Sequence, residues 1–109
     1  MPFEVLLTAD AVRDLEEITG WIAEHDAPAR AERVLERIEA AIAGLARFPA
    51  RGAHPRELLA LGIREYRETF FKPYRVIYRV EGKRVYVYLI ADGRRDMQTL
   101  LAQRLLGAW

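Results

Sequence analysis

The sequence predicts an α+β fold in which a pair of helices packs on a small, mainly antiparallel sheet. Two observations support this prediction. Apolar residues recur every three or four positions in the first half of the chain and every second position after Gly62, which is the periodicity of helices followed by that of strands. Helical segments that precede a meander of strands are typical of a two-layer α+β arrangement. The predicted order is one strand, two helices, three strands and a short C-terminal helix.

The chain begins with a predicted strand and a first helix. Residues 3–7 place an apolar side chain at every second position, which indicates a short strand. Thr8 offers an N-cap oxygen, and Asp10 in the first turn is favoured by the helix dipole. Apolar residues then recur at spacings of three and four, which predicts an amphipathic helix over roughly residues 9–25.

A second helix is predicted directly after the first. Asp26 is a suitable N-cap residue, and Pro28 is tolerated in the first turn of a helix. Apolar residues follow along one stripe as far as Leu45, and Phe48-Pro49 ends the helix. Because the connection is very short, the two helices are predicted to be antiparallel neighbours that form a helical hairpin.

The second half of the chain predicts the rest of the sheet. Residues 49–62 are irregular and contain three leucines, which predict one helical turn over an edge of the core. Three strands separated by turn residues follow. They are predicted over residues 64–71, 74–80 and 84–91. Asp96 then caps a short last helix.

The last two predicted strands indicate two different sheet faces. One face is aliphatic and is expected to pack on the helical hairpin. The opposite face mixes arginine with tyrosine and is the candidate working surface. In the last strand, the aliphatic set Val85, Val87, Leu89 and Ala91 alternates with Arg84, Tyr86, Tyr88 and Ile90.

Length and composition limit the class of protein. The 109 residues are predicted to form one domain over residues 1–109. A hydrophobic content of 51% with a net charge of +1 argues against a disordered chain. The absence of cysteine excludes disulfides, thiolate metal sites and a cysteine nucleophile. We expect a soluble cytoplasmic protein, because neither a secretion signal nor an apolar run long enough to span a membrane is visible.

The small net charge hides an uneven distribution. Residues 1–50 carry a charge of −5, residues 51–61 carry +1, and residues 62–109 carry +5. Most of the basic side chains are arginines, which suit bidentate contact with carboxylate or phosphate. The sheet and its C-terminal turn are therefore the first candidates for contact with an acidic partner. Ordinary solvated charge explains the same distribution without any partner.

Most kinds of catalytic or cofactor site lack their residues. The two histidines, His25 and His54, are not near an acidic cluster at ligand spacing, so no metal site is predicted. The chain contains no serine, which excludes a serine triad, and it has no glycine-rich phosphate loop. The carboxylates of the second helix interleave with Arg33 and Arg37, as on a solvated helix face. No cofactor is predicted.

What remains is a set of arginines and tyrosines on the sheet and its rim. The set consists of Arg64, Arg67, Arg75, Arg79, Arg94 and Arg95 with Tyr66, Tyr86 and Tyr88. Such a set can bind single-stranded RNA through phosphate contacts and stacking, stabilise a phosphorane during RNA cleavage, or dock an acidic protein. Cross-strand pairing of tyrosine with arginine, without any function, explains the same residues equally well.

Four stretches of the chain resemble one toxin family when they are taken in order. They are Thr8 to Ile18, Ile42 to Pro49, Tyr74 to Val80 and Asp92 to Asp96. Together they resemble the RelE/ParE superfamily of toxins from type II toxin–antitoxin modules, whose fold is a helical hairpin on a small twisted sheet. The most specific part is the tyrosine–arginine strand, followed by an aliphatic strand and a Gly-Arg-Arg turn.

The resemblance implies two alternative targets. RelE-like members cleave mRNA on the ribosome, using basic residues of the sheet and a Tyr or His near the C-terminus, whereas ParE-like members inhibit DNA gyrase. By the family pattern, a nuclease would use Arg67, Arg75 and Arg95. Six positions after Arg95, where the nuclease pattern has a tyrosine, this chain has Leu101. A leucine cannot take the ribose proton, so the resemblance to ParE is the closer one.

The resemblance therefore implies a non-enzymatic toxin that inhibits gyrase through its basic C-terminal half and that a cognate, ParD-like antitoxin neutralises. A ribosome-dependent mRNA endonuclease is the alternative, and a chain that only binds antitoxin is a third possibility. The six arginines are the candidate target contacts. The antitoxin is expected on the apolar groove of the helical hairpin or on a sheet edge. Its candidate contacts are Leu15, Trp21, Val34, Ile38 and Trp109, although packing in the core is the more expected role of Trp21.

Overall fold

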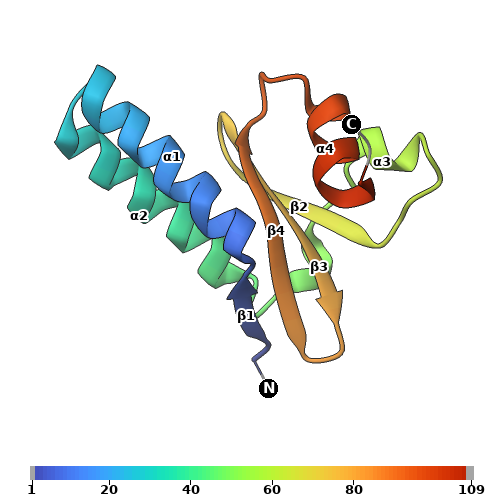
Figure 1. The fold of residues 1–109 in the computed structure, drawn as a ribbon. Helices are drawn as coiled ribbons and strands as arrows, with labels where there is room; N and C mark the ends of the chain where they lie inside the picture. Colours follow the sequence, from blue (N-terminus) through green and yellow to red (C-terminus); the bar gives the residue numbers. More distant parts are fainter. Residues whose placement is uncertain (1, 108–109) are drawn as a thin grey trace.

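The computed structural model describes residues 2–107 and has the predicted α+β architecture (Figure 1). Its order of elements, strand, two helices, three strands and a C-terminal helix, is the predicted one. The elements are β1 (Glu4–Leu7), α1 (Ala9–His25), α2 (Pro28–Gly44), the 3-10 helix η1 (Pro49–Arg51), α3 (Arg56–Leu59), β2 (Tyr66–Phe71), β3 (Tyr74–Glu81), β4 (Arg84–Asp92) and α4 (Met97–Leu106). The predicted turn of helix among the leucines is α3.

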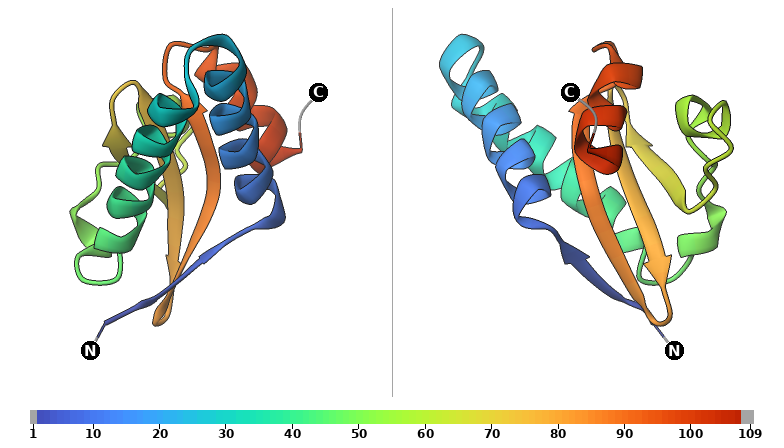
Figure 2. Two further views of the ribbon diagram at one scale, coloured as in Figure 1. Left: turned by 90° about the vertical axis from the view of Figure 1, so that its left-hand side faces the viewer. Right: turned by 45° about the vertical axis from the view of Figure 1, so that its right-hand side comes forward.

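The strands form one sheet in the order β1-β4-β3-β2. The pairs β2–β3 and β3–β4 are antiparallel, and β1 lies parallel to β4 at one edge. The helical hairpin of α1 and α2 covers one face of this sheet, while α3 and α4 lie on the opposite face (Figures 1 and 2). The sheet is therefore the middle of three layers, and side chains on both of its faces are enclosed.

The start of α1 is the predicted one. The Oγ1 of Thr8 accepts a hydrogen bond from the backbone N–H of Ala11 at 3.1 Å. The predicted cap of α2 is wrong: its N-cap residue is Ala27, which makes no side-chain cap. Asp26 instead pairs with Arg30, and its Oδ2 lies 2.9 Å from the Nε of that arginine. A residue that ends α1 is thus used to hold the first turn of α2.

The end of α2 also differs from the prediction, because the helix stops at Gly44 rather than at Phe48-Pro49. The N–H groups of Ala46 and Arg47 bond to carbonyls three residues earlier, which tightens the chain into turns. The carbonyl of Ala46 accepts the N–H of Phe3 at 2.7 Å. Because α2 ends at Gly44, the carbonyl of Ala46 is free to bond to Phe3, directly before β1.

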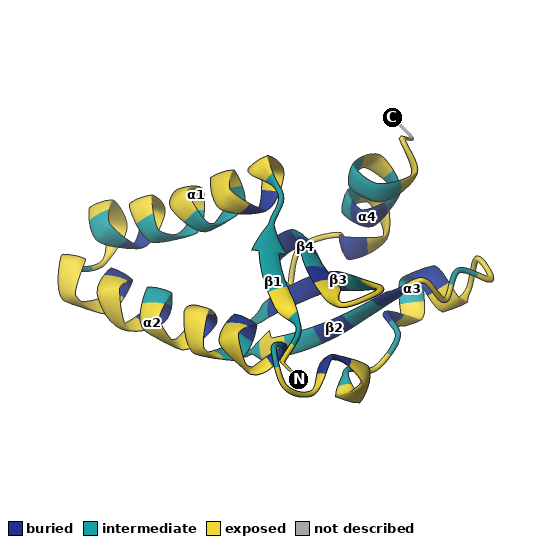
Figure 3. Ribbon diagram, turned by 90° about the horizontal axis from the view of Figure 1, so that it is seen from below, coloured by how far each residue is buried: buried dark blue, intermediate teal, exposed yellow. Residues whose placement is uncertain are grey.

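A first core fills the space between the helical hairpin and the sheet. Its fully buried members include Ile38 of α2, Val76 and Tyr78 of β3, and Val85 and Val87 of β4. Tyr78 is the one with a polar end, and its hydroxyl donates a hydrogen bond to the carbonyl of Pro49 at 2.6 Å. Buried segments of the sheet lie between both layers of helices in Figure 3. This face of β3 and β4 corresponds to the aliphatic face that was predicted to pack on the helical hairpin.

The alternation predicted for β4 fails at Tyr88. Tyr78 pairs with Val87 and Ile77 pairs with Leu89, so Tyr88 is an extra residue in β4. This β-bulge inverts the side-chain direction beyond it. Leu89 and Ala91 accordingly pack in a second core beneath α4, and Ile90 belongs to the first core. The prediction that the four aliphatic residues of this strand share one face is wrong for its last part.

The second core covers much of the face predicted to be an open arginine–tyrosine surface. Its members come from α3, β2, β3, β4 and α4. They are Leu58, Tyr66, Ile77, Leu89, Ala91, Met97 and Leu101. Asp96 caps α4 as predicted, and its Oδ1 accepts the N–H of Thr99 at 3.2 Å. The expected working surface is therefore reduced to its rims. No helix in the part of the chain that the structure describes is long and apolar enough to cross a membrane.

Candidate functional site

The six arginines predicted to contact a target do not form one cluster. Arg67 pairs with Tyr78 across β2 and β3, so it lies on the face of the helical hairpin. It donates a hydrogen bond from Nη1 to the carbonyl of Gly52 at 2.7 Å. Arg75 and Arg79 lie on the opposite face. Arg64 is exposed before β2. The structure therefore separates the three residues that a nuclease would combine.

Arg75 is buried and each of its guanidinium nitrogens donates a hydrogen bond to a carboxylate. The Nε donates to Glu68 at 2.7 Å, and both Nη atoms donate to Glu57 at 2.8 Å in a bidentate pair. Only 8% of Arg75 is exposed. The hydrogen bond from Arg75 holds the pKa of Glu57 below its ordinary value, and the same bond raises the pKa of Arg75 against the effect of burial. Each of the three guanidinium nitrogens of Arg75 is thus already bonded to a carboxylate, and the group is buried away from solvent.

The turn that follows β4 rests on the side chain of Arg75. A Cβ atom at Gly93 would come within 2.8 Å of the Cδ of Arg75 and 3.1 Å of the carbonyl oxygen of Pro73. The N–H of Gly93 also donates to that carbonyl at 2.7 Å. Glycine is therefore required by close approach at this position. The side chain of Arg75 therefore packs against the turn that carries Arg94 and Arg95.

The exposed turn presents two arginines with different surroundings. Arg94 is held by Asp92, with Nη2 donating to Oδ2 at 2.6 Å. This hydrogen bond lowers the pKa of Asp92. Arg95 is exposed and makes no salt bridge with any residue between 2 and 107. Both arginines line a pocket of about 400 Å³ between the turn and α1, whose walls include Trp21 and Tyr74.

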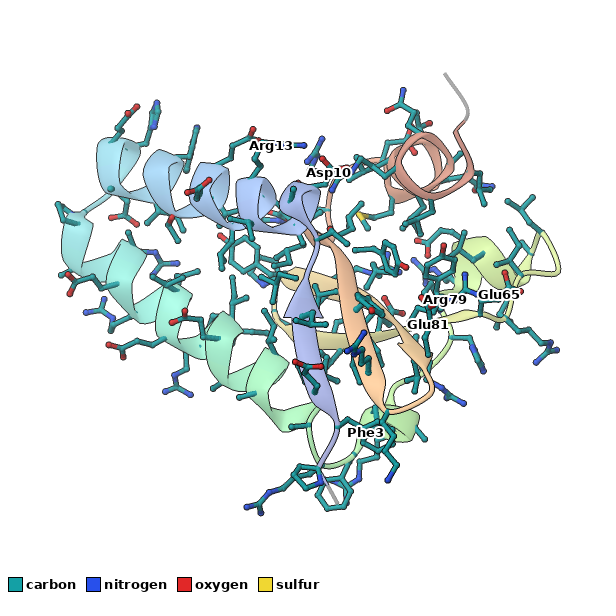
Figure 4. All side chains as sticks on the ribbon, turned by 60° about the horizontal axis from the view of Figure 1, so that its bottom comes forward. Phe3, Asp10, Arg13, Glu65, Arg79 and Glu81 are labelled. Carbon is teal, nitrogen blue, oxygen red and sulfur yellow. The ribbon has the colours of Figure 1, made fainter. Side chains whose placement is uncertain are left out.

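A rim of the second face holds arginine and tyrosine in mutual contact. The guanidinium of Arg79 lies 5.9 Å from the ring centroid of Tyr66, and the rings of Tyr66 and Tyr88 meet edge to face at 5.6 Å. Glu81 accepts a hydrogen bond from the Tyr88 hydroxyl at 3.1 Å and lies 3.7 Å from the Nε of Arg79. Figure 4 labels Arg79 and Glu81 close together. Direct cross-strand pairing accounts for the contact of Tyr66 with Arg79, whereas Arg79 and Glu81 lie two residues apart on β3.

The predicted antitoxin contacts also divide. Val34 and Ile38 are buried in the first core, so neither is available to a partner in this structure. Leu15 is partly buried against the same core. Trp21 is 62% exposed and stacks on His25 with ring centroids 4.5 Å apart, so the expectation of core packing is wrong. Ile22 takes the inward position on that turn of α1. Trp109 lies outside the described residues.

Leu101 is 1% exposed and belongs to the second core. The side chain at this position therefore packs against apolar neighbours and supplies no proton acceptor. No tyrosine or histidine follows Tyr88 in the sequence. Between residues 2 and 107, no three histidine or acidic side chains gather in a way that could hold a metal ion.

The sequence pattern places Arg33 and Arg37 on an ordinary solvated helix face. Arg30, Arg33 and Arg37 of α2 line a groove together with Lys72 of the β2–β3 turn. The available signal was their spacing, since positions separated by three and four residues fall on one side of a helix. The acidic residues of α2 obscured this stripe, because a sequence alone does not show which stripe faces the sheet.

Comparison with known proteins gives consistent results. The profile of the family described as ParE toxin of type II toxin-antitoxin system, parDE, matches residues 5–97. Toxin ParE3 of Caulobacter vibrioides is 30% identical over 100 residues, which are 92% of this chain and 96% of that protein.

Two solved structures share the fold. The chromosomal ParDE TA system from P. aeruginosa aligns with a TM-score of 0.69 and 20% identity over 83% of this chain and 95% of that one. The toxin-antitoxin complex RelBE2 from Mycobacterium tuberculosis aligns with a TM-score of 0.62 and 23% identity over 84% of this chain and 92% of that one.

Proposed function

The chain belongs to the ParE toxin family of type II toxin–antitoxin systems, and from that premise we propose that it inhibits DNA gyrase by binding, without catalysing a reaction. We further propose that a cognate, ParD-like antitoxin neutralises it. The cytoplasm, where gyrase and its DNA are found, is the corresponding location.

The observation that carries this proposal is the position of Leu101. Cleavage of RNA by its own ribose hydroxyl needs a group within hydrogen-bond reach that accepts the proton. Leu101 is buried in the second core, where a RelE-like nuclease would place a tyrosine. Arg75 is paired with two carboxylates, and Arg67 lies on the other face of the sheet. This arrangement supports binding rather than nuclease chemistry.

The proposed contact surface for gyrase consists of three exposed arginines of the predicted set and the partly exposed Arg79. These are Arg64, Arg79, Arg94 and Arg95. Exposed cations on a target-binding surface raise the association rate and favour an acidic partner. Arg75 is a positioning residue in this proposal, since it supports the turn through Gly93.

The proposed antitoxin contact is the pocket between α1 and the turn after β4. Trp21 is exposed at its wall, and Ile18, Ile22 and Ile90 line its interior. An exposed tryptophan beside a pocket with an apolar interior and a charged rim is a typical anchor in protein–protein interfaces. Quenching or a shift of the Trp21 emission on addition of the antitoxin tests this placement, with Trp109→Phe used to isolate its signal.

Supercoiling of relaxed plasmid by purified gyrase tests the proposed target. Wild-type toxin is expected to inhibit the reaction, and Arg94→Ala/Arg95→Ala is expected to need several times more protein for the same inhibition. Arg47→Ala/Lys83→Ala removes the same charge from exposed positions elsewhere and is the matched control. Full gyrase activity in the presence of a large excess of wild-type toxin would contradict the proposal.

A translation extract separates the proposal from the nuclease alternative. We expect intact mRNA when the toxin is added to translating ribosomes. Cleavage at fixed codon positions that is lost in Arg95→Ala would instead establish the ribosome as the target.

A further inference from the structure

A second basic surface lies away from the arginine–tyrosine face. It is a groove of about 300 Å³ between α2 and the turn that joins β2 to β3. Four cationic side chains line it together with buried or half-buried apolar and aromatic groups. The cations are Arg30, Arg33, Arg37 and Lys72, and the other lining residues are Val34, Phe71, Pro73 and Tyr74.

Most of these cations have no acidic partner. Arg30 pairs with Asp26. Arg33, Arg37 and Lys72 make no salt bridge with any residue of the described part of the chain, and all three are solvent-accessible. Their charges are therefore not neutralised locally, which favours the binding of an anion.

Basic and acidic side chains of α2 line different pockets. Arg30, Arg33 and Arg37 face the β2–β3 turn, whereas Glu32 lines a different pocket between α1 and α2. The helix that contributes to the acidic half of the sequence thus has a basic side. Along α2, Arg30 and Arg37 are separated by about 10 Å, so the stripe can follow an extended chain of negative charges.

The basic groove continues toward the turn after β4. Tyr74 lines both this groove and the pocket that contains Arg94 and Arg95. Burial raises the pKa of Tyr74 and the charge of Asp92 adds to this effect, while Arg30 and Arg94 act in the opposite direction. Tyr74 therefore separates the cations of this groove from a pocket of mixed charge, in which Arg94 and Arg95 lie beside Asp14, Glu17 and Asp92.

We propose that this groove binds the phosphate backbone of duplex DNA. Arginine and lysine on a helix and on adjacent turns are the groups that contact phosphates without reading sequence. The aromatic rings of the groove are only partly exposed, whereas three of its cations are exposed without an acidic partner, which favours contact with a phosphate backbone over stacking on unpaired bases. The inference extends the proposed function, because a toxin bound to gyrase would lie beside the DNA that gyrase holds.

Fluorescence anisotropy with a short labelled duplex of mixed sequence tests the proposal on the full chain without gyrase. Wild type is expected to bind, with an affinity that falls as salt rises from about 50 to 200 mM. In Arg33→Ala/Arg37→Ala/Lys72→Ala, the affinity is expected to fall at least about tenfold and the salt slope to decrease by about 2 to 3.

Two further variants separate the groove from general charge and from misfolding. Arg47→Ala/Arg56→Ala/Lys83→Ala removes the same charge from exposed positions elsewhere and is expected to bind nearly as wild type does. Arg33→Lys/Arg37→Lys keeps the charge and is expected to retain most of the affinity. Circular dichroism confirms that each variant has the wild-type fold.

Three outcomes would overturn the proposal. One is the absence of duplex binding by wild type at low salt. Another is an equal loss of affinity in the two triple variants, which would reduce the effect to net charge. The third is tight, groove-dependent binding of labelled polyglutamate with no binding of duplex, which would assign the groove to an acidic protein. Because gyrase is not present, none of these outcomes depends on the supercoiling assay.

Discussion

The two faces of the sheet are covered by different means. On the hairpin face, α1 and α2 bury an extended apolar surface around Ile38, Val76 and Val87. On the other face, two short helices cover a smaller core, and next to it Arg75 is buried with two carboxylates. Apolar burial is non-directional and insensitive to pH, whereas a buried ion pair depends on geometry and protonation. The two faces should therefore respond differently to substitution and to acid.

Removal of Arg75 should produce the largest effect. Arg75→Ala leaves Glu57 and Glu68 buried without their cation, and breaking a buried pair in this way costs about 3–5 kcal/mol. Urea denaturation of wild type and variant measures the change in the free energy of unfolding. Arg79→Ala removes a partly exposed arginine from the same strand and face, and it should stay close to wild type. A loss below about 1 kcal/mol in Arg75→Ala would show that solvent reaches the carboxylates.

A replacement of the whole charged group sharpens this prediction. In Arg75→Met/Glu57→Leu/Glu68→Met no charge is left unpaired, and buried ion pairs can often be replaced by apolar groups at little cost. The triple variant should therefore be more stable than Arg75→Ala. If it is less stable, the three residues contribute net stability beyond satisfying one another.

Acid should weaken the second face by a smaller amount. The pKa of Glu57 lies below its ordinary value of 4.5 in the folded protein because Arg75 donates to it. Its stabilising contribution is therefore complete above about pH 4.5 and is lost as the pH falls through the folded-state pKa. Urea midpoints measured between neutral pH and pH 3 should fall less steeply in Glu57→Gln than in wild type. Glu39→Gln, at an exposed site on α2, should keep the wild-type slope.

The smallest difference in stability is expected between the N-cap residues Thr8 of α1 and Asp96 of α4. Thr8→Ala should cost about 1 kcal/mol of global stability, because α1 packs on the main core. Asp96→Ala should mainly increase the local opening of the short α4 and change the global stability less. Amide hydrogen exchange distinguishes the two cases, since faster exchange confined to residues 97–106 is expected only in Asp96→Ala. Thr8→Ser retains the cap and is the control for the first variant.

The sequence predicted the hairpin face well, because periodicity reports burial directly. The existence of α1, the cap at Thr8 and the antiparallel pairing of the later strands all follow local rules, although Trp21 of the predicted α1 stripe is exposed. The second face was not predicted, because Tyr88 adds one residue to β4 and inverts every later side chain. Nothing in the run from Val85 to Ala91 marks this bulge, since apolar residues occupy consecutive positions there.

The candidate site was predicted less well than the fold. Arg67 and Arg75 come from neighbouring strands, yet the register places them on opposite faces. The pairing of Arg75 with Glu57 joins residues from a loop helix and a strand, a contact that no spacing rule indicates. Trp21 was assigned inward although Ile22 occupies the inward position. The basic stripe of α2 was visible as a spacing, but its direction depended on the position of the β2–β3 turn.

The parallel pairing of β1 with β4 has a consequence for synthesis on the ribosome. Residues 4–7 leave the ribosome first, but their partners are residues 84–87. The helical hairpin relies on local contacts and can form early, while its apolar side waits for β4. At about 5–20 residues per second, translation from Gly44 to Asp92 takes roughly 2–10 s. During that interval the nascent chain exposes an apolar, aggregation-prone surface, which a chaperone can bind until β4 has been synthesised and packs on the hairpin.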